Sequence, residues 1–303
     1  MRIRQPGKIR NWLWFLGREE SCVYLLQGKH TSMIVSGGMS YIVPDLLHQF
    51  DKCKIDDTSI TKLLILHAHF DHIGIVPFLK NRFPDLEIYA SVKAWEILQD
   101  PEKIDIMNRL NRTFAERIGL REAINKYCKE WSLEIGGHSI TQGDRIDLGN
   151  LQVDIHETPG HSSCSISAYS PQIKTLFPSD AGGIPYKDMI IPVGNSNFVE
   201  YLRSLKKLEK LDVDYICADH YGIIAGNEAK NYIKKSLEVS DRRFEMIKDA
   251  YLRTHDIEGV ARRMVKEFYA KNPDYFLPAV IAEGNYRRMI MSIANMVKMC
   301  PEY

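Results

Sequence analysis

The order of apolar runs and helical segments predicts an α+β fold in which helices flank two sheets. Strand-like runs occupy much of the first 90 residues, and further runs follow between residues 139 and 218. A helical segment over about residues 92–130 separates the two groups, and the chain is mostly helical again from residue 228 onward. Because strands and helices do not alternate regularly, this order disfavours one parallel sheet with crossover helices.

The strands predicted before the helical segment are short apolar runs bounded by turn signals. The run Leu63–Leu66 is continuously apolar, which is typical of a strand covered on both faces. Residues 1–10 are basic and are predicted to be irregular, whereas residues 46–50 begin or end a helix and residues 73–80 have helical spacing. The predicted strands of this part are residues 12–16, 22–26, 31–35, 63–66 and 86–90.

The second half of the sequence is predicted to form more short strands and then helices. A helix over residues 198–211 is indicated by Asn197, which can cap it, and by Glu200 three residues later. The helical tail is interrupted at Asn272-Pro273 and Leu277-Pro278. The strands predicted here are residues 139–140, 144–148, 151–157, 165–169, 175–177 and 215–218, with the last of these ending the series.

Composition excludes several classes of function. Forty Lys and Arg residues against 39 Asp and Glu residues argue against a nucleic-acid partner bound through bulk charge. No apolar run approaches the roughly 20 residues of a membrane helix, and we expect a cytoplasmic protein without a membrane partner. The six cysteines are widely scattered, which favours reduced thiols over a disulfide framework.

Four residues that can bind a metal follow the strand at Leu63–Leu66, in the pattern His67-x-His69-x-Asp71-His72. Side chains alternate along an extended chain, so His67 at the strand end and His69 point the same way and can reach one ion. Asp71 and His72 come as the chain leaves the strand and point to a neighbouring position. Three histidines and an aspartate in six residues have no packing rationale, and this pattern predicts a metal site.

Three later strand-like runs each lead directly to a His or Asp residue, namely His161, Asp180 and His220. Imidazole and carboxylate groups suit borderline ions such as Zn²⁺ or Fe²⁺. The predicted ligands are His67, His69 and His161 at one ion, Asp71, His72 and His220 at the other, and Asp180 bridging. Isolated histidines such as His138, His156 and His255 are interpreted as surface or core residues.

Together these motifs resemble the metallo-β-lactamase superfamily over roughly residues 12–225. The resemblance implies a four-layer αββα sandwich with a helical insertion and a helical C-terminal extension, and with the metal site at one edge between the sheets. A narrower similarity is to the PqsE-like quinolone-signal response thioesterases. Its basis is the insertion, the helical tail and the motifs Ser36-Gly37-Gly38, Gly160-His161-Ser162, Phe276-Leu277-Pro278 and Arg287-Arg288-Met289.

Two departures from the family pattern leave questions open. Family members often have glycine before the last histidine, whereas this chain has Asp219, which either orients an imidazole or lies at the surface. Ile184, Pro185 and Tyr186 follow the bridging Asp180 and leave the substrate undefined.

The helical insertion either packs on the body of the protein or covers the site. We expect a metallo-β-lactamase-like domain over residues 1–227 and a helical extension over residues 228–303 that packs over the active site.

The favoured hypothesis is a hydrolase with two divalent metal ions, Zn or Fe with Mn as a further candidate, that cleaves a small-molecule thioester or ester. An acyl-CoA-type thioesterase is preferred, and a bridging hydroxide would attack the carbonyl group. Asp71 would be both a ligand and a proton acceptor, and Tyr186 an oxyanion donor. A lactonase or a glyoxalase-II-like hydrolase is an alternative within this class.

Two hypotheses belong to other classes. A di-iron protein that reacts with oxygen or nitric oxide is disfavoured, because the resemblance implies glutamate at the position of His69 in such members. A regulatory interaction protein would act through a homodimer or a protein partner at the C-terminal helices. Its candidate contacts are the paired arginines Arg242, Arg243, Arg262, Arg263, Arg287 and Arg288, which can also meet coenzyme A phosphates.

Overall fold

The computed structural model describes residues 1–127 and 129–299. These residues form two compact units. The first unit contains Met1–Glu157, Cys164–Ser179 and Asp212–Lys230. The second contains Thr158–Ser163, Asp180–Leu211 and the described residues from Asn231 onward. Each unit is described below by itself, and the predicted domain boundary after residue 227 stays a prediction.

The first unit contains a mixed sheet whose parallel part leads to the histidine motif. Strands β5, β6, β7 and β8 are parallel, so their carboxyl ends meet at one edge of the sheet. Strands β2, β3, β4 and β5 are antiparallel neighbours. In spatial order the strands are β2 (Gly7–Arg10), β3 (Leu13–Arg18), β4 (Ser21–Gln27), β5 (Ser32–Val35), β6 (Ile60–Leu64), β7 (Glu87–Ser91) and β8 (His138–Ile140).

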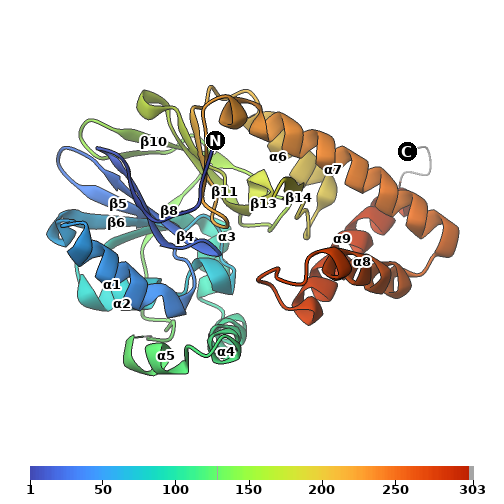
Figure 1. Cartoon of the computed structure of the whole chain (residues 1–303), viewed down its shortest axis with the longest axis horizontal. Coiled ribbons are helices and arrows are strands. Elements are labelled where there is room, and N and C mark those ends of the chain that lie inside the picture. Colours follow the sequence, from blue (N-terminus) through green and yellow to red (C-terminus); the bar gives the residue numbers. More distant parts are fainter. Residues whose placement is uncertain (128, 300–303) are drawn as a thin grey trace. The chain divides into compact units, whose positions relative to one another are not determined.

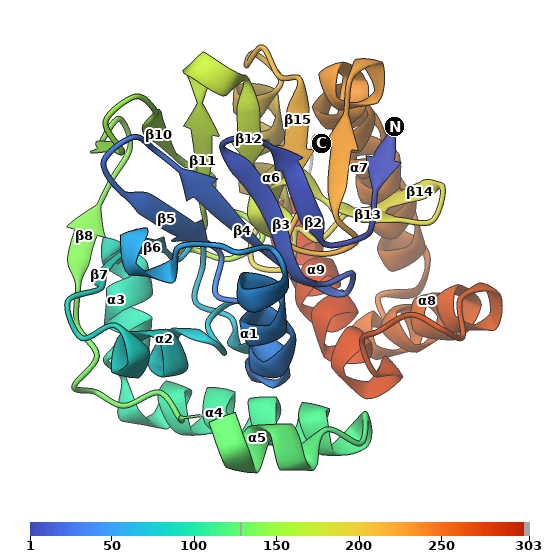
Figure 2. The same ribbon diagram turned by 60° about the vertical axis from the view of Figure 1, so that its left-hand side comes forward.

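The second sheet of this unit is antiparallel apart from one neighbouring pair, β12 and β15. The pair at its edge, β1 beside β16, joins the start of the chain to residues near 224 (Figure 2). In spatial order the strands are β1 (Arg2–Ile3), β16 (Ile223–Ala225), β15 (Tyr215–Cys217), β12 (Thr175–Phe177), β11 (Ile166–Ser170), β10 (Gln152–Glu157) and β9 (Arg145–Asp147).

Two expectations about strands were wrong. Residues 1–10, expected to be irregular, contain β1 and β2, and the run at residues 215–218 is followed by β16. Strands of two to four residues are too short to show a clear alternating pattern, and β1 depends on a partner more than 200 residues away. Gly222 makes this pairing feasible, because its φ is +87° and a Cβ there would lie 2.1 Å from the carbonyl oxygen of Ile3.

The apolar core of the first unit combines side chains from both sheets. Tyr24 on β4 links them, because its buried hydroxyl donates to the carbonyl oxygens of Ala218 at 2.5 Å and Gly222 at 3.2 Å. This bond fixes the loop between β15 and β16, which carries Asp219 and His220. Other core members are Leu13, Phe15, Leu26, Met33, Leu64, Leu66, Val153, Ile155, Ile166, Phe177 and Ile223.

Helices cover the outer face of the first sheet. There α1 (Val43–Lys52) and α2 (Val76–Arg82) lie against the sheet (Figure 1), and α3 (Val92–Leu98) contacts β7. The predicted insertion is helical but is divided into α3, α4 (Pro101–Arg117) and α5 (Arg121–Tyr127). The last two lie beyond α1 and α2 (Figure 2). Asp100 caps α4, since its Oδ1 accepts from the backbone nitrogens of Glu102 and Lys103 at 3.1 and 3.2 Å.

The second unit is mostly helical. Helix α6 (Phe198–Leu208) is capped as predicted, with Asn197 Oδ1 accepting from Glu200 N at 3.1 Å, but it ends before the predicted Leu211. The helical tail consists of α7 (Asn227–Thr254), α8 (Ile257–Lys271) and α9 (Ala279–Met299). A short hairpin, β13 (Ile184–Tyr186) with β14 (Met189–Ile191), was not predicted, because each strand has only three residues and the first contains a proline.

Two properties bear on the predicted environment of the protein. Among the helices of the described residues, none combines the length and apolar character needed to cross a bilayer. Cys22, Cys53, Cys164 and Cys217 are free thiols, while Cys128 and Cys300 lie outside the described residues. Burial raises the pKa of the Cys22 and Cys217 thiols well above the ordinary value, which keeps both protonated and unreactive.

Candidate metal centre

The histidine motif leaves β6 along a backbone that stays paired after the strand ends. Strand β6 ends at Leu64, two residues earlier than predicted. The chain remains fixed because Ile65 N donates to Tyr89 O at 2.8 Å and Ile166 N donates to Leu66 O at 2.9 Å. These bonds bring the backbone of the next residues, starting with His67, to the edge of the sheet.

The first two histidines of the motif meet as predicted. His67 Nε2 lies 3.1 Å from His69 Nδ1, so both rings point to the same place. The His67 side chain is fully buried, whereas His69 is partly exposed. Two imidazole nitrogens that converge in this way can bind one cation.

A second cluster combines Asp71, His72 and His220. His72 Nε2 lies 3.5 Å and His220 Nε2 lies 3.7 Å from Asp71 Oδ2. The ligand atoms of the three residues all lie within 4.8 Å of one another. Two nitrogens and a carboxylate oxygen at this spacing are a donor set that suits a divalent ion of borderline softness.

The remaining nitrogen of each histidine in this second cluster is held by an acceptor. His220 Nδ1 lies 2.7 Å from the carbonyl oxygen of Glu20, and His72 Nδ1 lies 2.9 Å from Asp219 Oδ2. A carbonyl oxygen can only accept, so His220 Nδ1 carries the hydrogen and the lone pair is on Nε2. The same tautomer follows for His72 beside a carboxylate. Both Nε2 atoms therefore present a lone pair to the cluster.

Asp219 also reaches His67, through Ser179. The Ser179 hydroxyl donates to Asp219 Oδ2 and lies 3.1 Å from His67 Nδ1. Since its hydrogen is used by Asp219, this hydroxyl accepts from His67 Nδ1–H and leaves the lone pair on His67 Nε2. One carboxylate thus orients a histidine of each cluster. Sequence reasoning did not identify Ser179, whose φ of +48° is unusual for a residue other than glycine.

The open question about Asp219 is resolved in favour of an orienting role. Its side chain is only 1% exposed. Its Oδ1 atom has no hydrogen-bond partner among the described residues. A buried carboxylate is unfavourable unless nearby positive charge compensates it. A divalent ion at the adjacent histidines would supply that charge, so the residues present fit a metal.

The second unit holds the other two predicted ligands as a pair. His161 Nε2 lies 3.3 Å from Asp180 Oδ2, and His161 Nδ1 donates to the carbonyl oxygen of Val193 at 2.8 Å. This backbone acceptor again places the lone pair on Nε2. Gly160 is required beside it, because its φ is +127° and a Cβ would lie 2.2 Å from the backbone nitrogen of Tyr201.

Helix α7 fixes the turn that follows Asp180. Tyr232 and Ser236 donate to the carbonyl oxygens of Gly183 and Gly182 at 2.9 and 2.8 Å.

Five of the predicted ligands lie in the first unit and two in the second. The assignment of His161 to the ion of His67 and His69, and the bridging role of Asp180, stay predictions.

His138 and Tyr186 each contact other side chains. His138 is on β8 with its ring 5.1 Å from that of Tyr89, and His255 is exposed. The Tyr186 hydroxyl donates to Asp274 Oδ1 at 3.0 Å, within the second unit. Lys187 holds the pKa of the Asp274 carboxyl below its usual value, so that this acceptor stays charged. The catalytic role predicted for Tyr186 stays a prediction.

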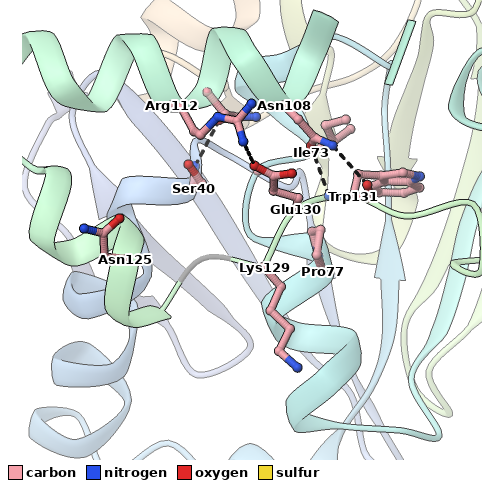
Figure 3. Close-up of a pocket in the computed structure, with 11 residues that line it drawn as sticks. Ser40, Ile73, Pro77, Asn108, Arg112, Asn125, Lys129, Glu130 and Trp131 are labelled. Atoms are coloured by element: carbon pink, nitrogen blue, oxygen red, sulfur yellow. Dashed lines mark hydrogen bonds and ion pairs between the residues drawn. The ribbon is translucent and has the colours of Figure 1, made fainter. Parts of the chain in front are cut away.

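The helical insertion packs against the motif loop and forms part of the lining of a cavity of about 330 Å³ (Figure 3). Asn111 Nδ2 on α4 donates to the carbonyl oxygen of Phe70 at 3.0 Å, directly before Asp71. Arg112 pairs with Glu130 at the cavity wall, and Asn108 exchanges two hydrogen bonds with the backbone of Trp131. Within the described residues the lining includes none of the predicted ligands. These contacts support a packing role for the insertion.

Comparison with known proteins identifies the class. The family model of the metallo-beta-lactamase superfamily matches residues 16–220. The match covers more than half of the chain, and the protein therefore belongs to the metallo-beta-lactamase superfamily. A solved structure of a metallo-beta-lactamase family protein from Thermus thermophilus, TTHA1429, superimposes with a TM-score of 0.69 over 96% of this chain and 95% of that chain, at 15% identity. This likeness confirms the predicted metallo-β-lactamase fold.

Individual relatives are distant. The metallo-beta-lactamase fold-containing protein ST1585 of Sulfurisphaera tokodaii is 22% identical over 82% of this chain and 87% of its own length. Acyl-coenzyme A thioesterase MBLAC2 of Gallus gallus is 24% identical over 71% of this chain and 78% of its own. A hydroxyacylglutathione hydrolase of Legionella pneumophila is 27% identical over 40% of this chain and 34% of its own. Fold and clusters together indicate a divalent-metal hydrolase.

We predict that Asp219→Asn weakens metal binding about 10- to 100-fold. The amide can turn its NH₂ group toward His72 Nδ1 and so no longer fixes the hydrogen there, and the variant loses the negative charge of the carboxylate. Competition with a fluorescent zinc chelator measures the affinity. Asp212→Asn is the matched control, since Asp212 is exposed and pairs with Lys174. Equal affinities for the Asp219 variant and the control would contradict the orienting role.

Proposed function

We propose that the protein is a cytoplasmic dinuclear metal hydrolase that cleaves a thioester or ester, with acyl-CoA-type thioesters favoured. The observation that supports this most strongly is the convergence of His72 Nε2 and His220 Nε2 on Asp71, each ring being held by an acceptor at Nδ1. Such rings are arranged for ligation before any ion arrives. Thioester or ester hydrolysis is a narrower activity than membership of the superfamily implies.

The proposed ligand set takes residues from both units, on the basis of the order of motifs along the chain. His67, His69 and His161 would hold one ion, and Asp71, His72 and His220 the other, with Asp180 between them. Histidine and aspartate suit Zn or Fe, with Mn as a further candidate. The identity of the ions is part of the proposal.

Divalent ions held by these residues would supply an acidified water and would polarise the carbonyl group of the substrate. The other roles in the mechanism, which are orienting the imidazole rings, accepting a proton and stabilising the oxyanion, belong to side chains of the protein. Asp219, Ser179 and Glu20 keep the imidazole rings in one tautomer, and Asp71 is proposed as the proton acceptor during collapse of the intermediate. Tyr186 is proposed as an oxyanion donor, after its hydroxyl leaves the exposed Asp274 carboxylate.

The net charge of the protein and its similarity to known hydrolases support the choice of substrate class. A formal net charge of +1 gives no indication of the strongly basic surface that a nucleic-acid phosphodiester substrate would require. The relative from Gallus gallus is named an acyl-coenzyme A thioesterase, and the one from Legionella pneumophila a hydroxyacylglutathione hydrolase. A lactonase or glyoxalase-II-like hydrolase is the alternative within this class, and similarity to the quinolone-signal response thioesterases stays a prediction.

An interaction role through the C-terminal helices is the second candidate. Helix α9 exposes Val280 and Met291, at 68% and 45% of their full area. Arg287 on the same helix donates to both carboxylate oxygens of Glu258, from Nε to Oε1 at 2.5 Å and from Nη2 to Oε2 at 2.6 Å. This pairing leaves Arg287 less available to a partner. We propose that a homodimer or protein partner would use the apolar positions first.

A substrate screen tests the proposal. The metal-loaded protein should hydrolyse acyl-CoA thioesters faster than simple esters, lactones, glutathione thioesters and phosphodiesters, and chelation should abolish the activity. The double variant His69→Ala/Asp71→Ala should lose hydrolysis, whereas Asp147→Ala on β9 is the control. Phosphodiesterase activity alone, or no hydrolysis by fully metal-loaded protein, would refute the proposal. A cellular role that survives in the double variant would favour the interaction candidate.

The role of Tyr186 is tested separately. If its hydroxyl stabilises the oxyanion, Tyr186→Phe should lower kcat about 100-fold or more with little change in KM. Tyr169→Phe is the control, because it also removes a tyrosine hydroxyl bonded to the protein, at the carbonyl oxygen of Asp212. An unchanged kcat with reduced thermal stability would assign Tyr186 a structural role.

A further inference from the structure

The turn between β3 and β4 carries the carbonyl oxygen that orients His220. This turn has only two residues, Glu19 and Glu20, and His220 Nδ1 donates to the Glu20 carbonyl oxygen at 2.7 Å. The turn also binds the next residue of the His220 loop, because Tyr221 N donates to the Glu19 carbonyl oxygen at 2.5 Å. Where this turn lies therefore sets where the His220 ring can be held.

Pairing of the two strands does not by itself fix the turn. The ladder between β3 and β4 is continuous and ends with Arg18 opposite Ser21. The two turn residues lie beyond this last pair, so the ladder leaves the direction of their carbonyl groups less constrained. Contacts that reach the turn from another element can thus position His220 without being needed for the strands to pair.

Such contacts come from α1 and from the single helical turn Ser40–Ile42 that precedes it. Helix α1 lies beside β3 (Figure 2). Tyr41, Asp45 and Gln49 follow one another at intervals of four residues, which places their side chains on one side of a helical backbone. Their partners are three residues at the end of the hairpin, namely Glu20, Arg18 and Gly17.

Gln49 makes the most direct of these contacts, because it binds the backbone itself. Its Oε1 atom accepts from Gly17 N and its Nε2 atom donates to Gly17 O, both at 2.8 Å. The ion pair of Asp45 with Arg18, at 2.8 Å, is about one-third exposed on both sides and is weakened by water. Gln49 therefore does more than Asp45 to fix the chain that leads into the turn.

Tyr41 holds the turn residue Glu20 directly. Its buried hydroxyl donates to Glu20 Oε1 at 3.0 Å. Burial raises the pKa of this hydroxyl well above its ordinary value, so that it remains a donor to the carboxylate. The Tyr41 ring is itself fixed by stacking on Phe114 of α4, with ring centres 6.1 Å apart and planes at 7°. A rigid buried donor thus anchors the residue whose carbonyl oxygen faces His220.

We propose that Gln49 and Tyr41 are positioning residues for the proposed metal ligand His220. Gln49 holds the backbone before the β3–β4 turn and Tyr41 holds Glu20, so that the Glu20 carbonyl oxygen stays within hydrogen-bond distance of His220 Nδ1. A ring held in this way keeps its Nε2 lone pair directed at the ion site. This inference rests on the metal site of the proposed function and does not depend on which bond is hydrolysed.

The zinc affinity of the double variant Tyr41→Phe/Gln49→Ala tests the proposal. The first change keeps the stacked ring and removes only its hydroxyl, and the second removes both bonds to Gly17. Competition with a fluorescent zinc chelator should show one ion bound about tenfold more weakly, because the His220 ring loses its support, and the other ion bound as in the wild type. Unchanged affinity for both ions, or an equal loss for both, would overturn the proposal.

Tyr89→Phe/Gln172→Ala is the matched control. The Tyr89 hydroxyl donates to Glu87 Oε2, and Gln172 Oε1 accepts from Gln152 N at 3.2 Å. The control therefore also removes a tyrosine–glutamate bond and a glutamine–backbone bond from the first unit, both away from the β3–β4 turn. Its affinity for both ions should match that of the wild type. A loss as large as that of the test variant would assign the effect to general destabilisation and reject the positioning role.

The cobalt-loaded protein separates failure of this inference from failure of the proposed function. Bound Co²⁺ shifts the ring N–H signals of the histidines that ligate it, so exchange of the His220 Nδ1 hydrogen with water can be followed by NMR. In Tyr41→Phe/Gln49→Ala this exchange should be about tenfold faster, since the bond to Glu20 is weakened. Exchange at His161 Nδ1, which donates to Val193 O in the second unit, should not change.

Equal exchange rates at His220 in the variant and the wild type overturn the inference, even if thioesters are hydrolysed. Faster exchange confined to His220 supports it, even if no thioester is hydrolysed. A wild-type protein that binds no cobalt refutes the metal site itself, and the inference with it.

Discussion

The predicted site depends on one constraint, namely that a histidine that is to bind a metal must keep its hydrogen on the nitrogen that faces away from the ion, as His67, His72, His161 and His220 do. The structure meets it with acceptors that cannot donate or are committed elsewhere: the carbonyl oxygens of Glu20 and Val193, the Asp219 carboxylate, and the Ser179 hydroxyl that donates to Asp219. Without these acceptors an imidazole would populate both tautomers and present an N–H to the ion for part of the time. The tautomer, and not merely the presence of histidine, is what the fold specifies.

Most of the surrounding structure can be understood as support for these acceptors. Tyr24 binds the carbonyl oxygens of Ala218 and Gly222, on either side of Asp219 and His220, and thereby ties their loop to the other sheet. Gly222 allows β1 to pair with β16 at the end of the same loop. In the second unit, α7 fixes the turn after Asp180, and Gly160, next to His161, allows the chain to lie close to the backbone of Tyr201. Distant parts of the chain thus converge on a few hydrogen bonds.

The sequence predicted the ligand motif because its chemistry is local. Histidines and aspartates concentrated at the ends of apolar runs are visible without any tertiary information, and the pairing of His67 with His69 follows from the alternation of side chains along extended chain. Glu20 and Ser179 could not be predicted, because they act through a backbone carbonyl 200 residues from His220 and through a hydroxyl 112 residues from His67. Strand β1 was missed for a related reason, since its partner β16 lies more than 200 residues away, whereas β16 was missed because it has only three residues.

The central claim is that these oriented imidazoles and carboxylates hold two divalent ions. Native mass spectrometry of the protein, after incubation with excess zinc and removal of unbound metal, counts the ions on each chain directly. The account predicts a mass increase that corresponds to two zinc ions per chain. A chain that retains no zinc, while its secondary structure is intact, would contradict it.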